Sequence, residues 1–224
     1  MILKNYIWNA PSFFNDKEVE LFHKTANKID FMDAEIGMGQ QDPDGDGGLK
    51  GDFNEDIRSS RVKWFGGHEM PQELIDKMYE ALYLACDESG WTDLITENEP
   101  PQYTVYDAQP NKKKGDFYTW HTDAGPEPLP NGVIRKLSMT IQLSDPDDYE
   151  GGHFQWLEPH RQLDKITEKD TSIDINQSIR TVPFSAKAKG SVVVFPSFVY
   201  HQVTPVLRGT RKSLVVWFNG QPYV

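Results

Sequence analysis

Apolar residues recur at three- and four-residue spacing in two stretches of the first hundred residues, as they do along one face of an amphipathic helix. The first stretch begins at Asn15, a favourable N-cap, and Glu18 follows three residues later as in a capping box. The second has Pro71 at its first helical position and a stop signal at Gly90. The two predicted apolar faces are Val19, Phe22, Ala26 and Ile29, and then Leu74, Met78, Leu82 and Ala85.

From Gln102 onward the pattern changes to short β-prone runs separated by Gly, Pro, Asn and Asp. The candidate strands are Gln102–Tyr106, Tyr118–Asp123, Lys136–Leu143, His153–Trp156, Arg180–Phe184, Ser191–Phe195, His201–Val206 and Lys212–Phe218. About eight strands at this spacing are typical of a sandwich or a jelly roll. We therefore expect a mainly β fold with α, namely a double-stranded β-helix (jelly roll) with N-terminal supporting helices.

The chain shows no Pro- or Ser-rich linker, internal repeat or low-complexity tract that would divide it. We expect one domain over residues 1–224, in which residues 1–100 form a helical support layer with a mobile loop and residues 101–224 form the jelly-roll core. The loop is the acidic, glycine-rich stretch Gly37–Asp56. Polar, glycine-rich loops often close over binding sites, so this stretch is a candidate lid.

Part of the same loop is similar to the start of an EF-hand, with acidic residues at Asp42, Asp44 and Asp46. The twelfth position of an EF-hand loop requires a bidentate Glu, and Phe53 occupies it here. The pattern therefore favours a mobile acidic loop over a calcium site.

Charge and cysteine content narrow the class of protein. A formal net charge of −11 argues against a general nucleic-acid binder, because neutralising phosphates needs a basic surface. Cys86 is the single cysteine, which rules out an internal disulfide framework, and its place in the second helical stretch predicts a buried structural thiol. Neither a signal peptide nor a membrane span is recognisable, so we expect a cytoplasmic protein with no membrane partner.

A candidate metal site consists of His121 and Asp123, two residues apart, and of His201, which lies 78 residues beyond Asp123. In a strand, residues two apart point to the same face. Two imidazoles and one carboxylate form the facial triad of non-haem Fe(II) oxygenases and leave positions open for a co-substrate and O₂. The same ligand types also suit Zn²⁺. Taken alone, the first two residues would favour a strand-edge histidine bonded to a nearby carboxylate, and the second histidine shifts the balance toward a metal site.

A candidate carboxylate clamp follows His201. Arg211 lies ten residues beyond it, and Ser213 shares a strand face with Arg211. The planar guanidinium binds a carboxylate through two hydrogen bonds, and the serine hydroxyl adds a donor. Arg208 is the alternative, but its place beside Gly209 predicts an exposed turn residue. We favour Arg211 as the residue that binds the distal end of a dicarboxylate.

These residues form the spaced pattern Tyr118-Thr-Trp-His121-Thr-Asp123, Gly151-Gly152 and His201-x-Val203-x-Pro205-Val206-x-x-Gly209-x-Arg211-x-Ser213. The pattern resembles the 2-oxoglutarate- and Fe(II)-dependent dioxygenases, particularly the prolyl 4-hydroxylase-like branch, and the likeness covers Gln102 to Phe218. The resemblance implies that His121, Asp123 and His201 bind iron. It also implies that Arg211, with Ser213 assisting, binds the C5 carboxylate of 2-oxoglutarate.

The resemblance further implies a tyrosine that contacts the co-substrate from the strand before His121. We choose Tyr106, although the insert Asp107–Asp116 leaves Tyr103 as an alternative, and Tyr118 would line the pocket. A strand around Arg58-Ser-Ser-Arg61 could face the substrate entrance. The remaining histidines are expected to be surface or packing residues, and they are His23, His68, His153 and His160.

The activity implied by the resemblance is hydroxylation of a substrate carbon with Fe(II), 2-oxoglutarate and O₂, and with ascorbate as a reductant. A prolyl or other residue of a peptide or protein is the expected substrate, and a small metabolite or a nucleobase stays open. The rival hypothesis is a non-catalytic, metal-binding jelly-roll module of the cupin or lectin kind. Such a module has no reason to carry a carboxylate clamp at the position of Arg211.

Overall fold

Two antiparallel β-sheets form the body of the computed structural model, which describes residues 5–41, 49–52, 54–66, 69–92, 95–109, 114–158 and 178–223. The larger sheet has nine described strands in the order β1-β14-β10-β16-β8-β6-β2, with β11 and β7 also paired to β16. Its strands are β1 (Trp8–Ala10), β2 (Met32–Asp33), β6 (Arg61–Trp64), β7 (Glu97–Asn98), β8 (Gln102–Asp107), β10 (Ile134–Gln142), β11 (Tyr149–Gly151), β14 (Val192–Pro196) and β16 (Val206–Gly220).

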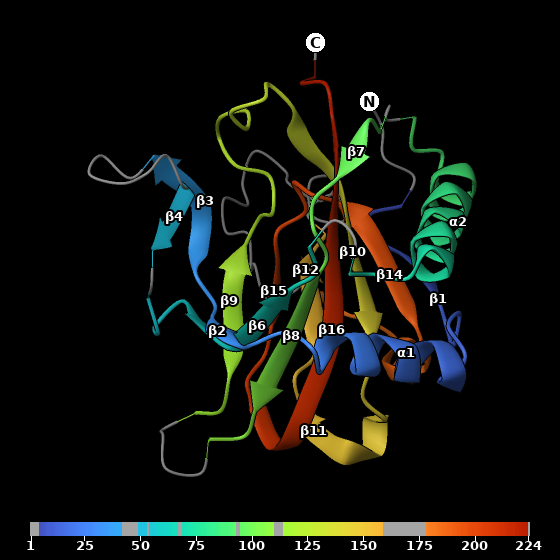
Figure 1. The fold of residues 1–224 in the computed structure, drawn as a ribbon, viewed down its shortest axis with the longest axis vertical. Helices are drawn as coiled ribbons and strands as arrows, with labels where there is room; N and C mark the ends of the chain where they lie inside the picture. Colours follow the sequence, from blue (N-terminus) through green and yellow to red (C-terminus); the bar gives the residue numbers. More distant parts are fainter. Residues whose placement is uncertain are drawn as a thin grey trace, which may run out of the picture.

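The smaller sheet has five described strands in the order β13-β12-β15-β9-β5. They are β5 (Arg58–Ser59), β9 (Phe117–His121), β12 (Phe154–Leu157), β13 (Ile179–Thr181) and β15 (His201–Val203). A pocket is lined by residues of both sheets, so the two sheets face each other across it. This arrangement is the predicted jelly roll (Figure 1).

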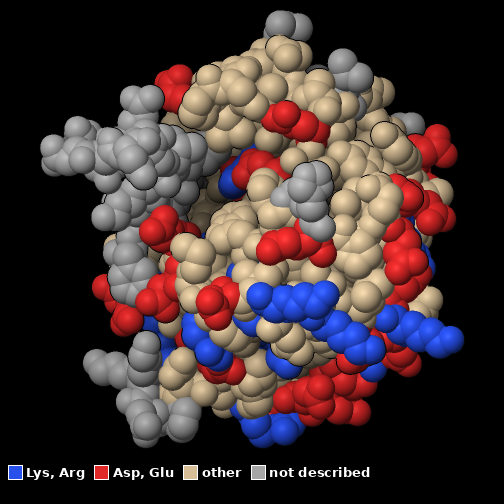
Figure 2. Space-filling model, in the orientation of Figure 1, with Lys and Arg blue, Asp and Glu red and all other residues tan. Residues whose placement is uncertain are grey.

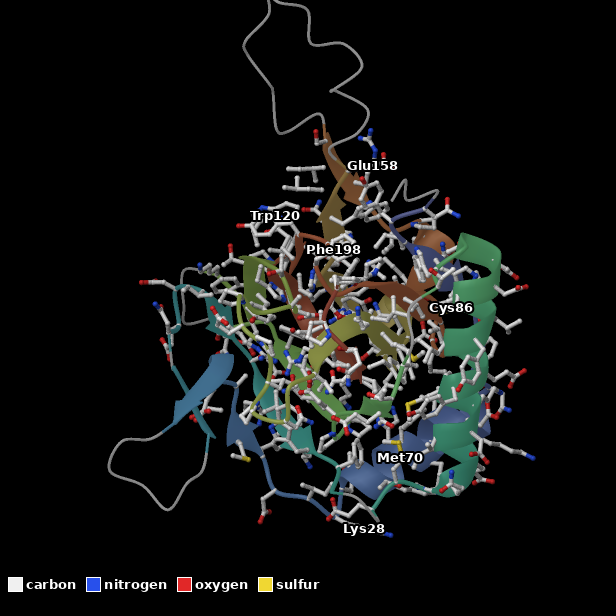
Figure 3. The ribbon with its side chains drawn as sticks, turned by 90° about the horizontal axis from the view of Figure 1, so that it is seen from above. Lys28, Met70, Cys86, Trp120, Glu158 and Phe198 are labelled. Carbon is white, nitrogen blue, oxygen red and sulfur yellow. The ribbon has the colours of Figure 1, made fainter. Side chains whose placement is uncertain are left out.

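Helices α1 (Asp16–Ala26) and α2 (Gln72–Ser89) are the two α-helices among the described residues. The predicted capping box is confirmed, because the Asn15 side chain accepts from the backbone of Glu18 while the Glu18 side chain accepts from that of Asn15. Pro71 is the N-cap of α2 instead of its first helical residue, and Gly90 ends the helix at a φ of 67°. Both helices lie to one side of the larger sheet, with Cys86 on that side (Figures 1 and 3).

The two faces of the larger sheet differ in polarity. Alternate residues of its central strands join the buried apolar faces of α1 and α2 in one hydrophobic core. From β10, β14 and β16, this core takes Leu137, Met139, Ile141, Val192, Val194, Leu214, Val216 and Phe218. The intervening buried positions include Ser138, Thr140, Gln142, Arg211 and Ser213. Since a strand alternates its side chains between faces, the sheet presents apolar residues to the helices and many polar ones to the pocket.

Four local predictions are wrong. The stretch Gly37–Asp56 contains a strand pair, β3 (Ile36–Gln41) with β4 (Leu49–Asp52), where a loop was expected. Its EF-hand-like segment at 42–48 lies outside the described residues, and its role as a lid stays a prediction. The strand predicted at Arg180–Phe184 ends at Thr181, and a 3₁₀ helix covers Phe184–Lys187.

The turn expected around Arg208 is replaced by the long strand β16. The strand predicted from His201 ends at Val203, because Pro205 has no N–H with which to continue a ladder. Gly209 lies within β16 at a φ of +71°, and a Cβ there would lie 1.9 Å from the carbonyl oxygen of Asp148. Its missing side chain therefore permits a close backbone approach. Glycine at this position marks an irregular strand and not a chain reversal.

Candidate active site

His121 and His201 are brought together by the smaller sheet. His121 ends β9, His201 begins β15, and the two residues are register partners. The His121 Nδ1–H donates to the Thr119 carbonyl at 2.7 Å, and the His201 Nδ1–H donates to the Val199 carbonyl at 2.8 Å. A carbonyl can only accept, so both Nδ1 atoms carry a proton, and in each ring Nε2 is the nitrogen that faces the Asp123 carboxylate. These backbone bonds orient each ring as a metal-bound histidine requires.

Asp123 completes this cluster from just beyond the strand. The strand β9 ends at His121, so the expectation that Asp123 shares a strand face with it is wrong. Asp123 is instead positioned by its backbone N–H, which donates to the Ser197 carbonyl at 2.9 Å. Its carboxylate oxygens lie 3.6 Å from His121 Nε2 and 3.7 Å from His201 Nε2. The three ligand atoms lie within 4.8 Å of one another, close enough to hold one metal ion.

The electrostatics of the cluster suit a cation. Burial and then His121 lower the pKa of His201 to about 4 against the opposing effect of Asp123, so the ring is neutral at pH 7. Burial alone would raise the pKa of Asp123, but the neighbouring His201 and His121 outweigh burial and hold this pKa well below its usual range. Neutral imidazoles with an ionised carboxylate are the protonation states in which such residues bind a metal.

Arg135 and Glu99 support the cluster from the larger sheet, and neither was predicted. Arg135 Nη1 donates to the Asp123 carbonyl oxygen at 3.4 Å, while Nε and Nη2 each donate to the Glu99 carboxylate at 2.6 Å. Its guanidinium also lies 4.1 Å from the centre of the Trp217 ring. Glu99 precedes Arg135 by 36 positions, so no local pattern in the chain could have indicated the pair.

A pocket extends from the three ligands between the sheets. Figure 2 shows basic and acidic residues interspersed on one face of the molecule, with a hollow between them. Trp120 lies outside the pocket, where it stacks on Tyr200 at a centroid distance of 5.6 Å (Figure 3). The lining includes all seven residues that the sequence singled out, namely His121, Asp123, His201, Arg211, Ser213, Tyr106 and Tyr118.

Arg211 is a buried cation of this pocket, with only 1% of its surface exposed. Its Nη1 donates to Ser213 Oγ at 3.3 Å, and its Nε is buried without a hydrogen-bond partner. Among the described residues, no carboxylate forms an ion pair with it. A buried charge without a counter-ion is costly, and a bound carboxylate would remove that cost. The residues present thus fit a dicarboxylate co-substrate. Arg208, by contrast, is exposed and pairs with Glu150.

The two alternative tyrosines lie on opposite faces of β8, as residues three apart in a strand must. Tyr106 lines the pocket and lies 5.4 Å beneath the Arg211 guanidinium. Tyr103 faces α1, where its hydroxyl bonds His23 Nδ1 at 2.9 Å. Tyr118 stacks on His121 at a centroid distance of 3.5 Å, and burial raises its pKa to about 12. Residues 110–113 of the insert lie outside the described residues.

Arg58 is a second guanidinium in the pocket lining. It lies on β5, and its Nη2 donates to Gln102 Oε1 at 2.7 Å. The guanidinium also lies 4.7 Å from the Tyr118 ring centre. The sequence indicated a strand facing the entrance here without distinguishing Arg58 from Arg61, which is exposed and pairs with Asp107.

The remaining expectations concern residues away from the ligands. His23 is a packing residue as predicted, whereas His68 and His160 lie outside the described residues. Cys86 is only partly buried against the helical core, so the prediction of a buried thiol is met in part. None of the helices in the described ranges is long and apolar enough to cross a membrane.

Comparison with known proteins assigns the family. The model of the 2OG-Fe(II) oxygenase superfamily matches residues 101–219, which is more than half of the 224-residue chain. The chain belongs to the 2OG-Fe(II) oxygenase superfamily. Membership in this superfamily implies Fe(II) and 2-oxoglutarate, and the matched region contains all seven predicted site residues.

Curated relatives of this superfamily member include proteins named PKHD-type hydroxylase. One from Shewanella baltica is 32% identical over 121 residues, which cover 54% of this chain and 42% of that relative. Another from Sphingopyxis alaskensis is 37% identical over 121 residues, covering 54% of this chain and 44% of the relative. The matched region thus spans less than half the length of these relatives.

Solved structures similar to this superfamily member share its fold at low sequence identity. A prolyl hydroxylase from Trichoplax adhaerens, in complex with a hypoxia inducible factor peptide fragment, has a TM-score of 0.63 at 17% identity, covering 96% of this chain and 84% of that one. A Pseudomonas putida prolyl-4-hydroxylase has a TM-score of 0.61 at 18% identity, with coverage of 97% and 94%. A carbocyclase from nogalamycin biosynthesis has 0.59 at 14%, with coverage of 96% and 80%. At these identities the likeness shows the jelly-roll fold alone.

Proposed function

We propose that this chain is an Fe(II)- and 2-oxoglutarate-dependent hydroxylase that acts on a prolyl or another residue of a peptide or protein. One observation carries the proposal. A three-residue metal cluster and the buried Arg211, which has no carboxylate partner among the described residues, line the same pocket. A metal-binding module without oxidation chemistry has no use for the second feature.

In this proposal, His121, Asp123 and His201 hold the iron, and Arg211 with Ser213 holds the distal carboxylate of 2-oxoglutarate. When bound, these groups let O₂ convert 2-oxoglutarate to succinate and CO₂ while one oxygen atom enters a substrate C–H bond. The protein's part is geometric. The backbone bonds of both histidines orient their Nε2 atoms, and the apolar walls at Phe154 and Phe195 exclude water.

The choice of a peptide or protein substrate rests on the names of the relatives and the titles of the similar structures. Several of these are hydroxylases, and one was solved with a peptide. The carbocyclase from nogalamycin biosynthesis supports a small-molecule substrate as the second candidate. Ascorbate as a reductant, a cytoplasmic location and the absence of a nucleic-acid partner stay predictions.

The test is succinate formation from 2-oxoglutarate under Fe(II) and O₂, together with mass spectrometry of a peptide and metabolite panel for the gain of one oxygen atom. We expect His121→Ala to lower turnover by at least about a hundredfold, because the variant loses a metal ligand. Gln202→Ala is the matched control, since Gln202 neighbours His201 on β15 but bonds Gln155 outside the pocket lining.

Turnover that persists in His121→Ala, or that does not need 2-oxoglutarate, would contradict the proposed chemistry. Oxygen gain in metabolites but in no peptide would support the small-molecule candidate and reject the peptide substrate.

A further inference from the structure

Three basic residues come from segments that pack together around Arg211 and Tyr149. Arg211 comes from β16, Lys187 ends the 3₁₀ helix Phe184–Lys187, and His153 follows Gly152 just before β12. A Cβ on Gly152 would lie 2.8 Å from Arg211 Cδ and 3.4 Å from Tyr149 Cε2. The Arg211 stem therefore packs directly against the backbone that carries His153, with the Tyr149 ring beside it.

Lys187 is half-buried over this group. Its Nζ lies 4.9 Å from the centre of the Tyr149 ring. Within the described ranges it forms no ion pair or hydrogen bond. Lys189, two residues further along, shows the ordinary arrangement, because its Nζ pairs with the Asp16 carboxylate at 2.7 Å. The positive charge of Lys187 is thus not neutralised by a described carboxylate, and it contributes to the electrostatic potential around Tyr149 and Arg211.

The charges of the cluster oppose one another. Burial and then Arg211 lower the pKa of Lys187. Burial, Lys187 and then Arg211 lower the pKa of His153. No described carboxylate offsets these effects in either case. Repulsion between like charges in a half-buried cluster destabilises the ligand-free protein. Proteins retain such destabilising arrangements mainly at sites where they contribute to ligand binding.

Polar atoms without partners surround the same place. Arg211 Nε, Tyr149 Oη and Gln142 Oε1 are buried and have no hydrogen-bond partner among the described residues. Arg211, Tyr149 and Gln142 are only 1%, 2% and 4% exposed. Gln142 is the register partner of Ser213, whose hydroxyl accepts from Arg211. Buried polar groups are rarely left unpaired, and Arg211, which alone of these three residues lines the pocket, is therefore available to a polar ligand.

We propose that Lys187 is a specificity-determining residue of the pocket, which acts with Arg211 so that a 2-oxo acid with a second carboxylate binds in preference to one without it. The inference rests on the proposed function. Lys187 does not line the pocket itself, so it acts through the field that it adds at Arg211 and not through contact with the ligand. The positive electrostatic field of Lys187 strengthens the binding of a ligand that carries a second negative charge. It does not depend on the chain length of the ligand.

The experiment uses the full chain loaded with Fe(II) in the absence of O₂. Calorimetric titration measures the dissociation constants of 2-oxoglutarate and of 2-oxopentanoate, which has the same chain length but lacks the second carboxylate. The variants are Lys187→Met, the charge-conserving Lys187→Arg, and Lys189→Met as the matched control. The melting temperature of each ligand-free variant is measured alongside.

We expect Lys187→Met to weaken 2-oxoglutarate binding on the order of tenfold and to leave 2-oxopentanoate binding within about twofold. Lys187→Arg and Lys189→Met should bind both acids as the wild type does. The ligand-free Lys187→Met variant should melt at or above the wild-type temperature, because repulsion is relieved. A merely structural lysine would give a lower melting temperature.

Equal weakening for both acids, no weakening for either, or the same effect from Lys189→Met would overturn the role of Lys187. A wild-type protein that binds both acids with equal affinity would also overturn this inference alone. A wild-type protein that binds neither acid would overturn the proposed function and the inference with it.

Discussion

At the residue scale, two Arg–Glu ion pairs differ in how much they contribute to stability, because they differ in exposure to solvent. Arg135 and Glu99 keep 15% and 18% of their side-chain surface exposed, and their pair anchors the Asp123 carbonyl. Arg208 and Glu150 form a pair of the same residue types at 59% and 61% exposure. Exposed pairs contribute little to stability, whereas removing one partner of a buried pair leaves the other charge desolvated.

The first prediction compares these two arginines. We expect Arg135→Met to lower the free energy of unfolding by about 2 to 3 kcal/mol, somewhat below the cost for a fully buried pair, because Glu99 stays partly hydrated. Arg208→Met should change it by less than about 1 kcal/mol. Urea unfolding of both variants measures the difference. Similar losses in the two would show that burial does not govern the Arg135 pair.

At the element scale, glycines decide how closely the connections approach the sheets. Gly190 precedes β14, and its carbonyl accepts from the Phe14 N–H at 2.9 Å, which attaches the segment before α1 to the larger sheet. A Cβ on Gly190 would lie 1.8 Å from the Phe14 carbonyl oxygen. Gly132, in the turn before β10, has a similar positive φ of +83° but open space around it.

Substituting both glycines separates backbone strain from the clash. Gly132→Ala bears only the positive φ and should cost about 1 to 2 kcal/mol of stability. Gly190→Ala bears the same strain together with a collision against backbone, so we expect about 3 to 5 kcal/mol. Thermal and urea unfolding report both values. Equal costs would mean that the segment before α1 moves away freely from the sheet.

At the scale of the whole molecule, the larger sheet separates a helical core from the pocket, and each side holds a histidine, which is buried at His201 and partly buried at His23. His201 lies at the metal cluster, while His23 bonds Tyr103 and the Leu143 carbonyl on the helical side. Burial is the largest cause that lowers the pKa of His23, followed by Lys212. An unfolded chain returns each histidine to its ordinary pKa near 6.5 and so takes up protons below that pH.

The stability of the metal-free protein should therefore fall as the pH decreases through 6.5 toward 4, since the folded pKa values lie below the unfolded one. We expect His23→Gln to reduce this loss, because it removes one proton-binding site of the unfolded chain. Lys24→Gln, an exposed neighbour on α1, should leave the pH dependence unchanged. The measurement is urea unfolding at a series of pH values. An unaltered slope in His23→Gln would contradict the desolvation of His23.

Local patterns in the sequence predicted much of this fold because the physics behind them is local. The capping box at Asn15, the stop at Gly90 and the β-prone runs that form β10 and β14 depend on neighbours a few residues away. The predictions failed where the local structure depends on contacts with residues far away in the sequence. The expected turn at Gly209 became part of β16, because that glycine fits against Asp148. The pair of Arg135 with Glu99 joins positions that share no local signal.

The sequence by itself determined the mainly β fold, the candidate ligands His121, Asp123 and His201, and the choice of Arg211 over Arg208. Each depends on residue type and spacing, which follow from strand periodicity and ligand chemistry. Only the tertiary structure decided that Tyr106 faces the pocket while Tyr103 faces α1. It alone brought Lys187 and Arg211 to the same surroundings at Tyr149 and Gly152, because the folded sheets determine which charges lie near one another in space.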